Sequence, residues 1–140
     1  MYDGCVTTNY RDTFIQVAAD CPAERAEIPP ANPLKPSVAA LQYELLIEHP
    51  YEFTSDELLF AVYARRASIA DDLMEQERAL FFAKPQACLR SSPLSKRYGW
   101  GTHHDGNCRV ALVGLGTAEY DRLIADPKLA QKQAMRSAKV

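Results

Sequence analysis

The sequence predicts an α+β fold, a small antiparallel sheet with helices packed mainly on one face. Apolar residues recur at helical spacing between residues 37 and 83, whereas after residue 88 the period shortens to two, which is typical of strands. The resulting order is one strand, three helices, a hairpin and a last helix. A chain of 140 residues can bury one core without help from disulfides or metal.

The first part of the chain is expected to be extended. Residues 13–18, TFIQVA, alternate weakly and are rich in β-branched and aromatic side chains, so they are predicted to form the first strand. The stretch 22–36 holds five of the nine prolines, which are excluded from helix interiors and sheet centres. It is therefore expected to be an extended loop.

Three helices are predicted next, each beginning at a hydroxyl side chain that can accept a backbone N–H. The second and third also show the spacing of a capping box, with an acidic residue three positions after the hydroxyl. Pro50 and Pro85 are expected to end the first and the third helix. These helices cover residues 37–49, 54–67 and 68–83, with Ser37, Thr54 and Ser68 as their caps.

The β part of the fold follows. Short strands are expected over 88–90, 98–104 and 108–113, and Asp105 with Gly106 supplies the turn of a hairpin between the last two. A three-residue turn would place Trp100 opposite Leu112, and Thr102 opposite Val110. Thr117 would cap a final helix through Ala125.

The chain is predicted to hold a single α+β domain over 1–126 and a basic C-terminal arm over 127–140. After Asp126 there are four basic residues and no acidic ones, and the segment lacks an apolar face. The arm is therefore expected to be helical or disordered. Its basic residues are Lys128, Lys132, Arg136 and Lys139.

Composition restricts the class of protein. The longest purely apolar run, Leu58–Ala64, is far shorter than the roughly 20 residues needed to span a bilayer, so no membrane association is expected. The N-terminal residues form no signal peptide, which predicts a cytoplasmic protein with reduced cysteines. A pI of 5.9 and a single tryptophan do not predict nucleic-acid binding. The free thiols would be those of Cys5, Cys21, Cys88 and Cys108.

Charge is arranged in blocks. Residues 37–77 hold nine acidic residues and only two basic ones, Arg65 and Arg66, whereas residues 78–104 hold five basic residues and no acidic one. The basic block either packs beside the acidic helices of the same molecule, in pairs worth under about 1 kcal/mol each, or binds an external anion.

Two segments resemble a family of uncharacterised bacterial proteins. They are SSPLSKRYGWGTH at 91–103, and TFIQVAADCP at 13–22 with IPP at 28–30. The likeness extends over nearly the whole chain, but the family is defined only as a domain of unknown function. It therefore implies no reaction, no cofactor and no catalytic residue.

The basic block carries the main candidate site, which combines cations and hydroxyls with an aromatic strand. Arginine can bind a phosphate or carboxylate through two hydrogen bonds, and serine hydroxyls add short directional ones. The segment lacks the glycines of a phosphate-binding loop, and it could equally be a solvated loop. The predicted ligand-binding residues are Arg90, Ser92, Ser95, Lys96, Arg97, Tyr98 and Trp100.

Two glycines in the following strand allow two interpretations. Gly99 and Gly101 would lie on one face, with Tyr98 and Trp100 on the other. The bare face could form a trough for a ligand, or another part of the chain could cross it closely.

The hairpin carries a weaker candidate for catalysis. A three-residue turn would place His104 opposite Cys108, and a two-residue turn would place His103 there, close enough for imidazole to lower the thiol pKa. Such a pair could also be an incidental polar turn. No metal site and no cofactor is predicted, because adjacent strand residues point to opposite faces.

The function expected from the sequence is binding of an anionic small molecule or partner through the basic serine-rich loop and the Tyr-Gly-Trp-Gly strand. The alternative is a small hydrolytic or thiol-based enzyme that uses the Cys-His pair. Whether the protein is an enzyme, and how many subunits it has, are left open by the sequence.

Overall fold

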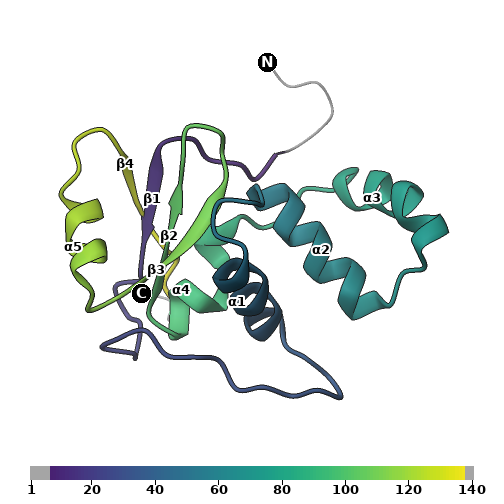
Figure 1. Cartoon of the computed structure of the whole chain (residues 1–140), viewed down its shortest axis with the longest axis horizontal. Coiled ribbons are helices and arrows are strands. Elements are labelled where there is room, and N and C mark those ends of the chain that lie inside the picture. The colour runs from purple at the N-terminus through teal and green to yellow at the C-terminus, as the bar shows by residue number, and fades with distance from the viewer. Residues whose placement is uncertain (1–6, 138–140) are drawn as a thin grey trace.

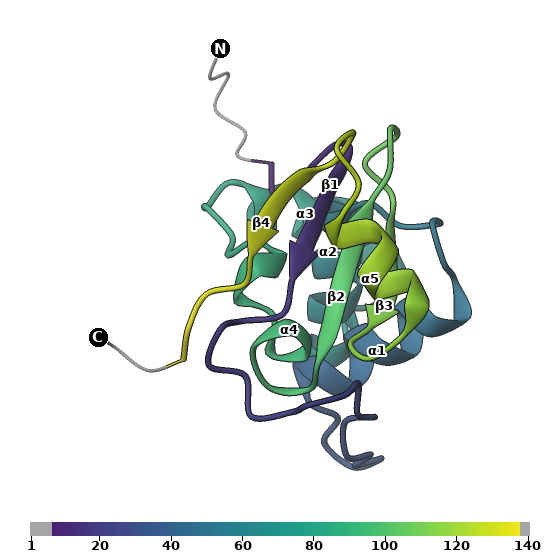
Figure 2. The ribbon, with the colours of Figure 1, turned by 90° about the vertical axis from the view of Figure 1, so that its left-hand side faces the viewer.

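A four-stranded sheet forms the centre of the molecule, in the order β3-β2-β1-β4 (Figures 1 and 2). The computed structural model describes residues 7–137. β1 is antiparallel to β2, and β2 is antiparallel to β3, whereas β4 is parallel to β1. The sheet is therefore mixed. The strands are β1 (Thr13–Gln16), β2 (Trp100–His104), β3 (Val110–Gly114) and β4 (Ala130–Gln133).

Helices lie mainly on one face of this sheet. Figure 1 shows α1 and α2 on one side, α5 alone on the other, and α3 at the end of a helical arm. This arrangement confirms the α+β class. The helices are α1 (Val38–Glu48), α2 (Ser55–Ala67), α3 (Met74–Phe82), α4 (Pro93–Arg97) and α5 (Ala118–Ile124).

The strand β1 divides the core into two layers because its side chains alternate between the faces. Ile15 packs with Leu46 and Leu58 of the α1–α2 layer. Phe14 packs with α5, where its ring lies 5.1 Å from that of Tyr120. No helix in the described range is long and apolar enough to cross a membrane.

Local capping signals were sufficient for three helix starts. The hydroxyls of Ser37, Thr54 and Thr117 accept the expected backbone N–H groups of α1, α2 and α5, and Thr54 with Glu57 completes a capping box. These three predictions are confirmed.

The prediction that Ser68 starts the third helix is wrong. Ser68 ends α2 in a left-handed conformation, with φ at +53°, and its N–H donates to the Arg65 carbonyl. The next N–H, from Ile69, donates to the Ala64 carbonyl, so the last turn of α2 is closed here. A short 3₁₀ turn, η1 (Asp71–Leu73), then precedes α3.

Two further predictions fail between residues 88 and 99. The strand expected at 88–90 is a 3₁₀ turn, η2 (Leu89–Ser91), and the basic serine-rich segment expected to be a loop contains α4. Pro93 occupies the first position of α4, where its fixed φ suits a helix and its missing N–H has no cost.

The C-terminal segment is also different from the prediction. Instead of a helical or disordered arm, residues 130–133 form β4, because the open edge of β1 supplies backbone partners. The Ala130 N–H donates to the Asp12 carbonyl, and that of Ala134 to the Gln16 carbonyl. All four side chains of β4 are exposed, so no apolar pattern marks this strand in the sequence. Residues 138–140 lie outside the described range.

Candidate functional site

The two serines of the basic loop are buried. The Ser92 hydroxyl accepts the Leu94 N–H at 3.1 Å as the cap of α4, and it donates to Gln42 Oε1 at 2.6 Å. The Ser95 hydroxyl donates to the Trp100 carbonyl at 2.6 Å. These hydroxyls hold α4 against α1 and β2, and both are already engaged within the protein.

Arg90 and Trp100 are likewise bonded to the backbone. Arg90 Nε donates to the Gln133 carbonyl at 2.7 Å, which ties the loop to β4. Trp100 Nε1 donates to the Glu27 carbonyl at 2.8 Å, and its ring lies 5.5 Å from that of Tyr43. Both side chains therefore help to hold the fold.

Three of the predicted ligand-binding residues have side chains that do not hold the fold together through hydrogen bonds or ion pairs within residues 7–137. The side chains of Lys96, Arg97 and Tyr98 make no hydrogen bond or ion pair with the described residues, and Arg97 is exposed. An anion site on this segment stays a prediction, and it rests on these three residues.

The face of the two glycines is filled by other parts of the chain. A Cβ at Gly99 would lie 2.6 Å from the Arg25 carbonyl oxygen, and a Cβ at Gly101 would lie 2.7 Å from Phe14 Cζ. Gly99 also has φ at +77°, which side chains rarely adopt. The glycines allow close packing, and the proposed ligand trough is wrong.

The predicted hairpin register is wrong as well. Trp100 pairs with Gly114, Thr102 with Leu112, and neither histidine faces Cys108. Asp105 Oδ1 accepts two backbone N–H groups further along the turn, so five residues connect the strands. Cys108 lies in this turn with φ at +65°. The cross-strand pairing that suggested a thiol enzyme is absent.

His104 belongs to the interior. Its exposed fraction is 0%, Nε2 lies 3.0 Å from the Thr102 hydroxyl, and Nδ1 has no hydrogen-bond partner among residues 7–137. Burial lowers the pKa of His104 to about 4, with a smaller contribution from His103. His104 is therefore a neutral core residue at physiological pH.

Tyr10 packs edge-on against His104, with 5.4 Å between ring centroids. Its hydroxyl lies 3.1 Å from Cys88 Sγ. Burial and this contact raise the pKa of Tyr10 to about 12, so the phenol stays protonated. Cys21, Cys88 and Cys108 are free thiols, and Cys5 lies outside the described residues.

His103 faces the other side of the sheet, where its Nδ1 lies 2.7 Å from the Tyr51 hydroxyl. Burial lowers the pKa of His103, and burial together with Glu119 raises the pKa of Tyr51. At neutral pH the phenol therefore donates to a neutral imidazole. Within residues 7–137, no three histidine, cysteine or acidic side chains converge as a metal site would need.

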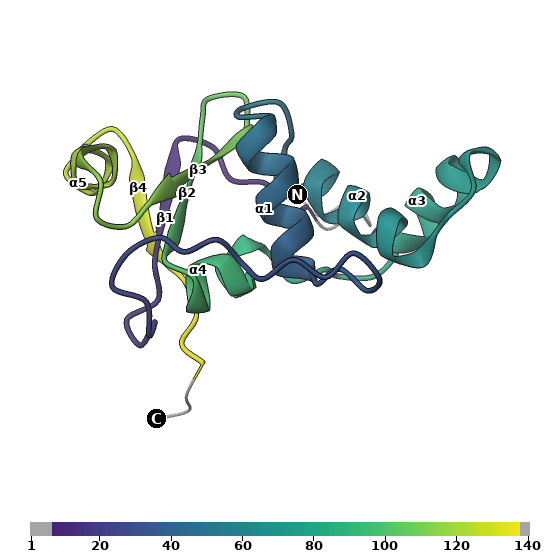
Figure 3. The ribbon, with the colours of Figure 1, turned by 60° about the horizontal axis from the view of Figure 1, so that its bottom comes forward.

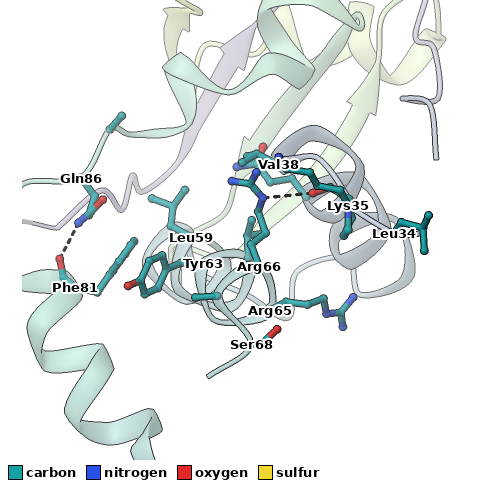
Figure 4. Close-up of a pocket in the computed structure, with 15 residues that line it drawn as sticks. Leu34, Lys35, Val38, Leu59, Tyr63, Arg65, Arg66, Ser68, Phe81 and Gln86 are labelled. Atoms are coloured by element: carbon teal, nitrogen blue, oxygen red, sulfur yellow. Dashed lines mark hydrogen bonds between the residues drawn. The ribbon is translucent and has the colours of Figure 1, made fainter. Parts of the chain in front are cut away.

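A pocket of about 640 Å³ lies among the helices, away from these residues. Figure 4 shows side chains from α1, α2 and the end of α3 around it, with residues 34–36 along one side. Its wall combines aliphatic and aromatic side chains with three cations. The main lining residues are Leu34, Lys35, Val38, Gln42, Leu59, Val62, Tyr63, Arg65, Arg66, Phe81 and Gln86.

The three cations differ in their partners. Arg65 forms an ion pair of 2.6 Å with Glu44. Arg66 donates only through Nε, at 3.3 Å, to the Pro36 carbonyl (Figure 4), and the Lys35 ammonium has no protein partner in the described range. The positive charges of Arg66 and Lys35 are therefore not neutralised by an acid.

Gln42 is the most unusual residue of the pocket. Only 2% of it is exposed, and its Oε1 is fixed by Ser92. The Ser92 hydroxyl donates to Oε1 at 2.6 Å, a length typical of an O–H···O bond and short for an N–H···O bond, so the amide oxygen faces Ser92. The Nε2 of Gln42 makes no hydrogen bond with any described residue. A donor of a largely buried side chain thus reaches the pocket surface without an acceptor among the described residues.

The sequence does not indicate this pocket, because its residues come from separate segments, 34–42, 59–68 and 81–87. One signal was available, since Arg65 and Arg66 are the only basic residues of the acidic block at 37–77. Nothing in the sequence marks Gln42.

Neither a curated protein nor a solved structure matches the chain. One family model matches over almost its entire length, in agreement with the resemblance carried by the segments at 13–30 and 91–103. The chain belongs to the family of unknown function DUF6157, whose model covers residues 5–140.

Proposed function

We propose that this protein binds a small organic anion with an apolar or aromatic body in the pocket between α1, α2 and α3. The anion expected from the sequence is retained, but its site moves from the basic loop to Arg66, Lys35 and Gln42. Of the predicted residues, Ser92 keeps a part, because it holds Gln42 in place.

The body of the ligand is inferred from the pocket wall. Leu59, Val62, Tyr63 and Phe81 present aliphatic and aromatic surface, with 4.9 Å between the ring centroids of Tyr63 and Phe81. Small-molecule sites combine such a wall with a few placed polar groups.

The acidic group is inferred from the charge. The Arg66 guanidinium keeps N–H groups free beyond its single bond to Pro36, and it can bind a carboxylate or phosphate through two of them. Lys35 adds a second charge at the same pocket.

Gln42 is the observation that carries the proposal. Its Nε2 has no acceptor among the described residues and keeps a small accessible surface at the pocket. A ligand oxygen there would accept a hydrogen bond from a side chain whose position Ser92 already fixes, so little ordering is needed on binding.

The proposal is tested by calorimetric titration with 2-naphthoate and with its neutral analogue 2-naphthamide. We expect the wild-type protein to prefer the acid, and Arg66→Gln to reduce its affinity by about tenfold or more, because a hydrogen bond to a charged group contributes about 1.5–3 kcal/mol. The amide should bind both proteins equally.

Arg122→Gln is the matched control, since Arg122 is an exposed arginine of α5 on the opposite face of the sheet. It should bind naphthoate as the wild type does. Equal binding of acid and amide to the wild type, or equal loss in both variants, contradicts the proposal.

A further inference from the structure

The helix α3 contains no buried residue, although it is nine residues long. Figures 1 and 3 show it at the end of an arm, away from the sheet. Isolated helices of this length are marginal in water, and they depend on packing for stability. The inner side of α3 has such packing, since Phe81 lies 5.7 Å from the Phe60 ring of α2, and the Arg78 guanidinium lies 5.7 Å from the same ring.

The arm exposes large apolar side chains. Leu80 of α3 is 57% exposed, and Leu73 just before α3 is 45% exposed. Leu73 ends the 3₁₀ turn η1 and Leu80 lies near the end of α3, so exposed leucines occur at both ends of the arm.

An apolar groove lies on the same arm. It has a volume of about 450 Å³ and is formed where α2 meets the start of α3, with Phe60, Ala64, Ile69 and Met74 in its wall. Leu80 is six residues beyond Met74, a rise of about 9 Å along a helix. The arm therefore carries both an exposed leucine and an apolar groove, and Leu80 and Met74 are separated along the helix.

The charge of the arm changes sign in the same direction. Asp71, Asp72, Glu75 and Glu77 lie in its first half, and Arg78 and Lys84 in its second. When two such arms pack antiparallel, the acidic half of each lies beside the basic half of the other. When they pack parallel, the two acidic halves lie together and so do the two basic halves.

We infer that a second copy of this chain packs antiparallel on the α3 arm, with Leu80 of each copy in the groove of the other. In this two-fold arrangement each Leu80 fills a groove of the other copy, and each acidic half of an arm lies beside a basic half. The same surface is thus used by both copies, as a self-complementary interface requires. The groove shares Arg65 and Ser68 with the larger pocket, but Leu80 and the charges of the arm lie outside that pocket.

Sedimentation velocity at about 100 µM protein, where a complex with a micromolar dissociation constant is almost fully formed, tests this arrangement. We expect twice the chain mass of 15.6 kDa. Leu80→Asp should weaken the dimer at least about tenfold, because it places a charge in an apolar groove. Ile124→Asp, at a similarly exposed apolar residue of α5, should leave it intact. A monomeric wild type, or a dimer that survives Leu80→Asp with unchanged affinity, overturns the inference.

A charge exchange tests the orientation. One variant carries Asp71→Lys and Asp72→Lys, and the other carries Lys84→Glu, because Arg78 packs on Phe60 and Phe82 within the arm. Each alone should be monomeric, and an equimolar mixture should form a heterodimer that weakens with salt. Circular dichroism confirms that both variants remain folded. If both folded variants dimerise alone as the wild type does, the antiparallel arrangement is wrong.

Discussion

Gly99→Ala is expected to destabilise the protein by roughly 2–5 kcal/mol, the larger of the two stability effects proposed here. Two causes add. The backbone at Gly99 has φ at +77°, which costs an L-residue about 1–2 kcal/mol, and the new methyl group would lie 2.6 Å from the Arg25 carbonyl oxygen. Urea denaturation measures the change as a lower midpoint with an unchanged slope.

Gly106→Ala is the matched control. Its nearest neighbour would be Asp12 Oδ1 at 3.5 Å, an ordinary contact, and its φ is not positive. We expect a change within about 0.5 kcal/mol. A Gly99→Ala protein as stable as this control would mean that the glycine face is open, and it would restore the ligand trough.

The second large effect is a loss of stability in acid caused by His104. The unfolded chain takes up a proton near the ordinary histidine pKa of 6.5, whereas the folded protein does so only near 4. As the pH falls from 6.5 to 4, the unfolded state binds more protons, so the free energy of unfolding decreases. The difference between the two pKa values corresponds to about 3 kcal/mol. Below pH 4 this contribution does not change further.

The free energy of unfolding of wild type and His104→Gln, measured by urea denaturation between pH 4 and 7, checks this expectation. The variant should lose the contribution of His104 to this slope, whatever its stability at pH 7, and keep the smaller contribution of His103, whose pKa burial also lowers. His49→Gln, at a partly exposed histidine that pairs with Glu52, should keep the slope. A wild-type slope in His104→Gln would show that other groups cause the acid sensitivity.

The parts of the fold that depend on local chemistry could be predicted. Ser37, Thr54 and Thr117 cap helices through atoms three residues away, and such contacts are visible in the sequence. The α+β class follows from the change of hydrophobic period.

The predictions fail where contacts between residues distant in the sequence determine the local structure. The strand β4 forms because β1 has a free edge, and the hairpin register depends on the two N–H groups that Asp105 accepts. Ser68 is followed by the residues of a helix start, but it ends α2 instead. Its N–H donates a hydrogen bond to the Arg65 carbonyl, which closes the last turn of α2.

The candidate pocket could not be predicted from the sequence, because it too depends on contacts between distant residues. Arg66, Lys35 and Gln42 meet only after α1, α2 and the proline-rich loop have packed. The importance of Gln42 depends on its burial and on the proton of Ser92, and a sequence contains neither.

The most direct test of the proposed site is a titration of the isotope-labelled protein with 2-naphthoate, followed by heteronuclear NMR. We expect the largest shifts at residues 34–42, 59–68 and 81–87, and a downfield shift of the Gln42 side-chain amide as Nε2 gains an acceptor. Shifts centred on Lys96 and Arg97, with the Gln42 amide unchanged, would contradict the account and place the anion on the basic loop.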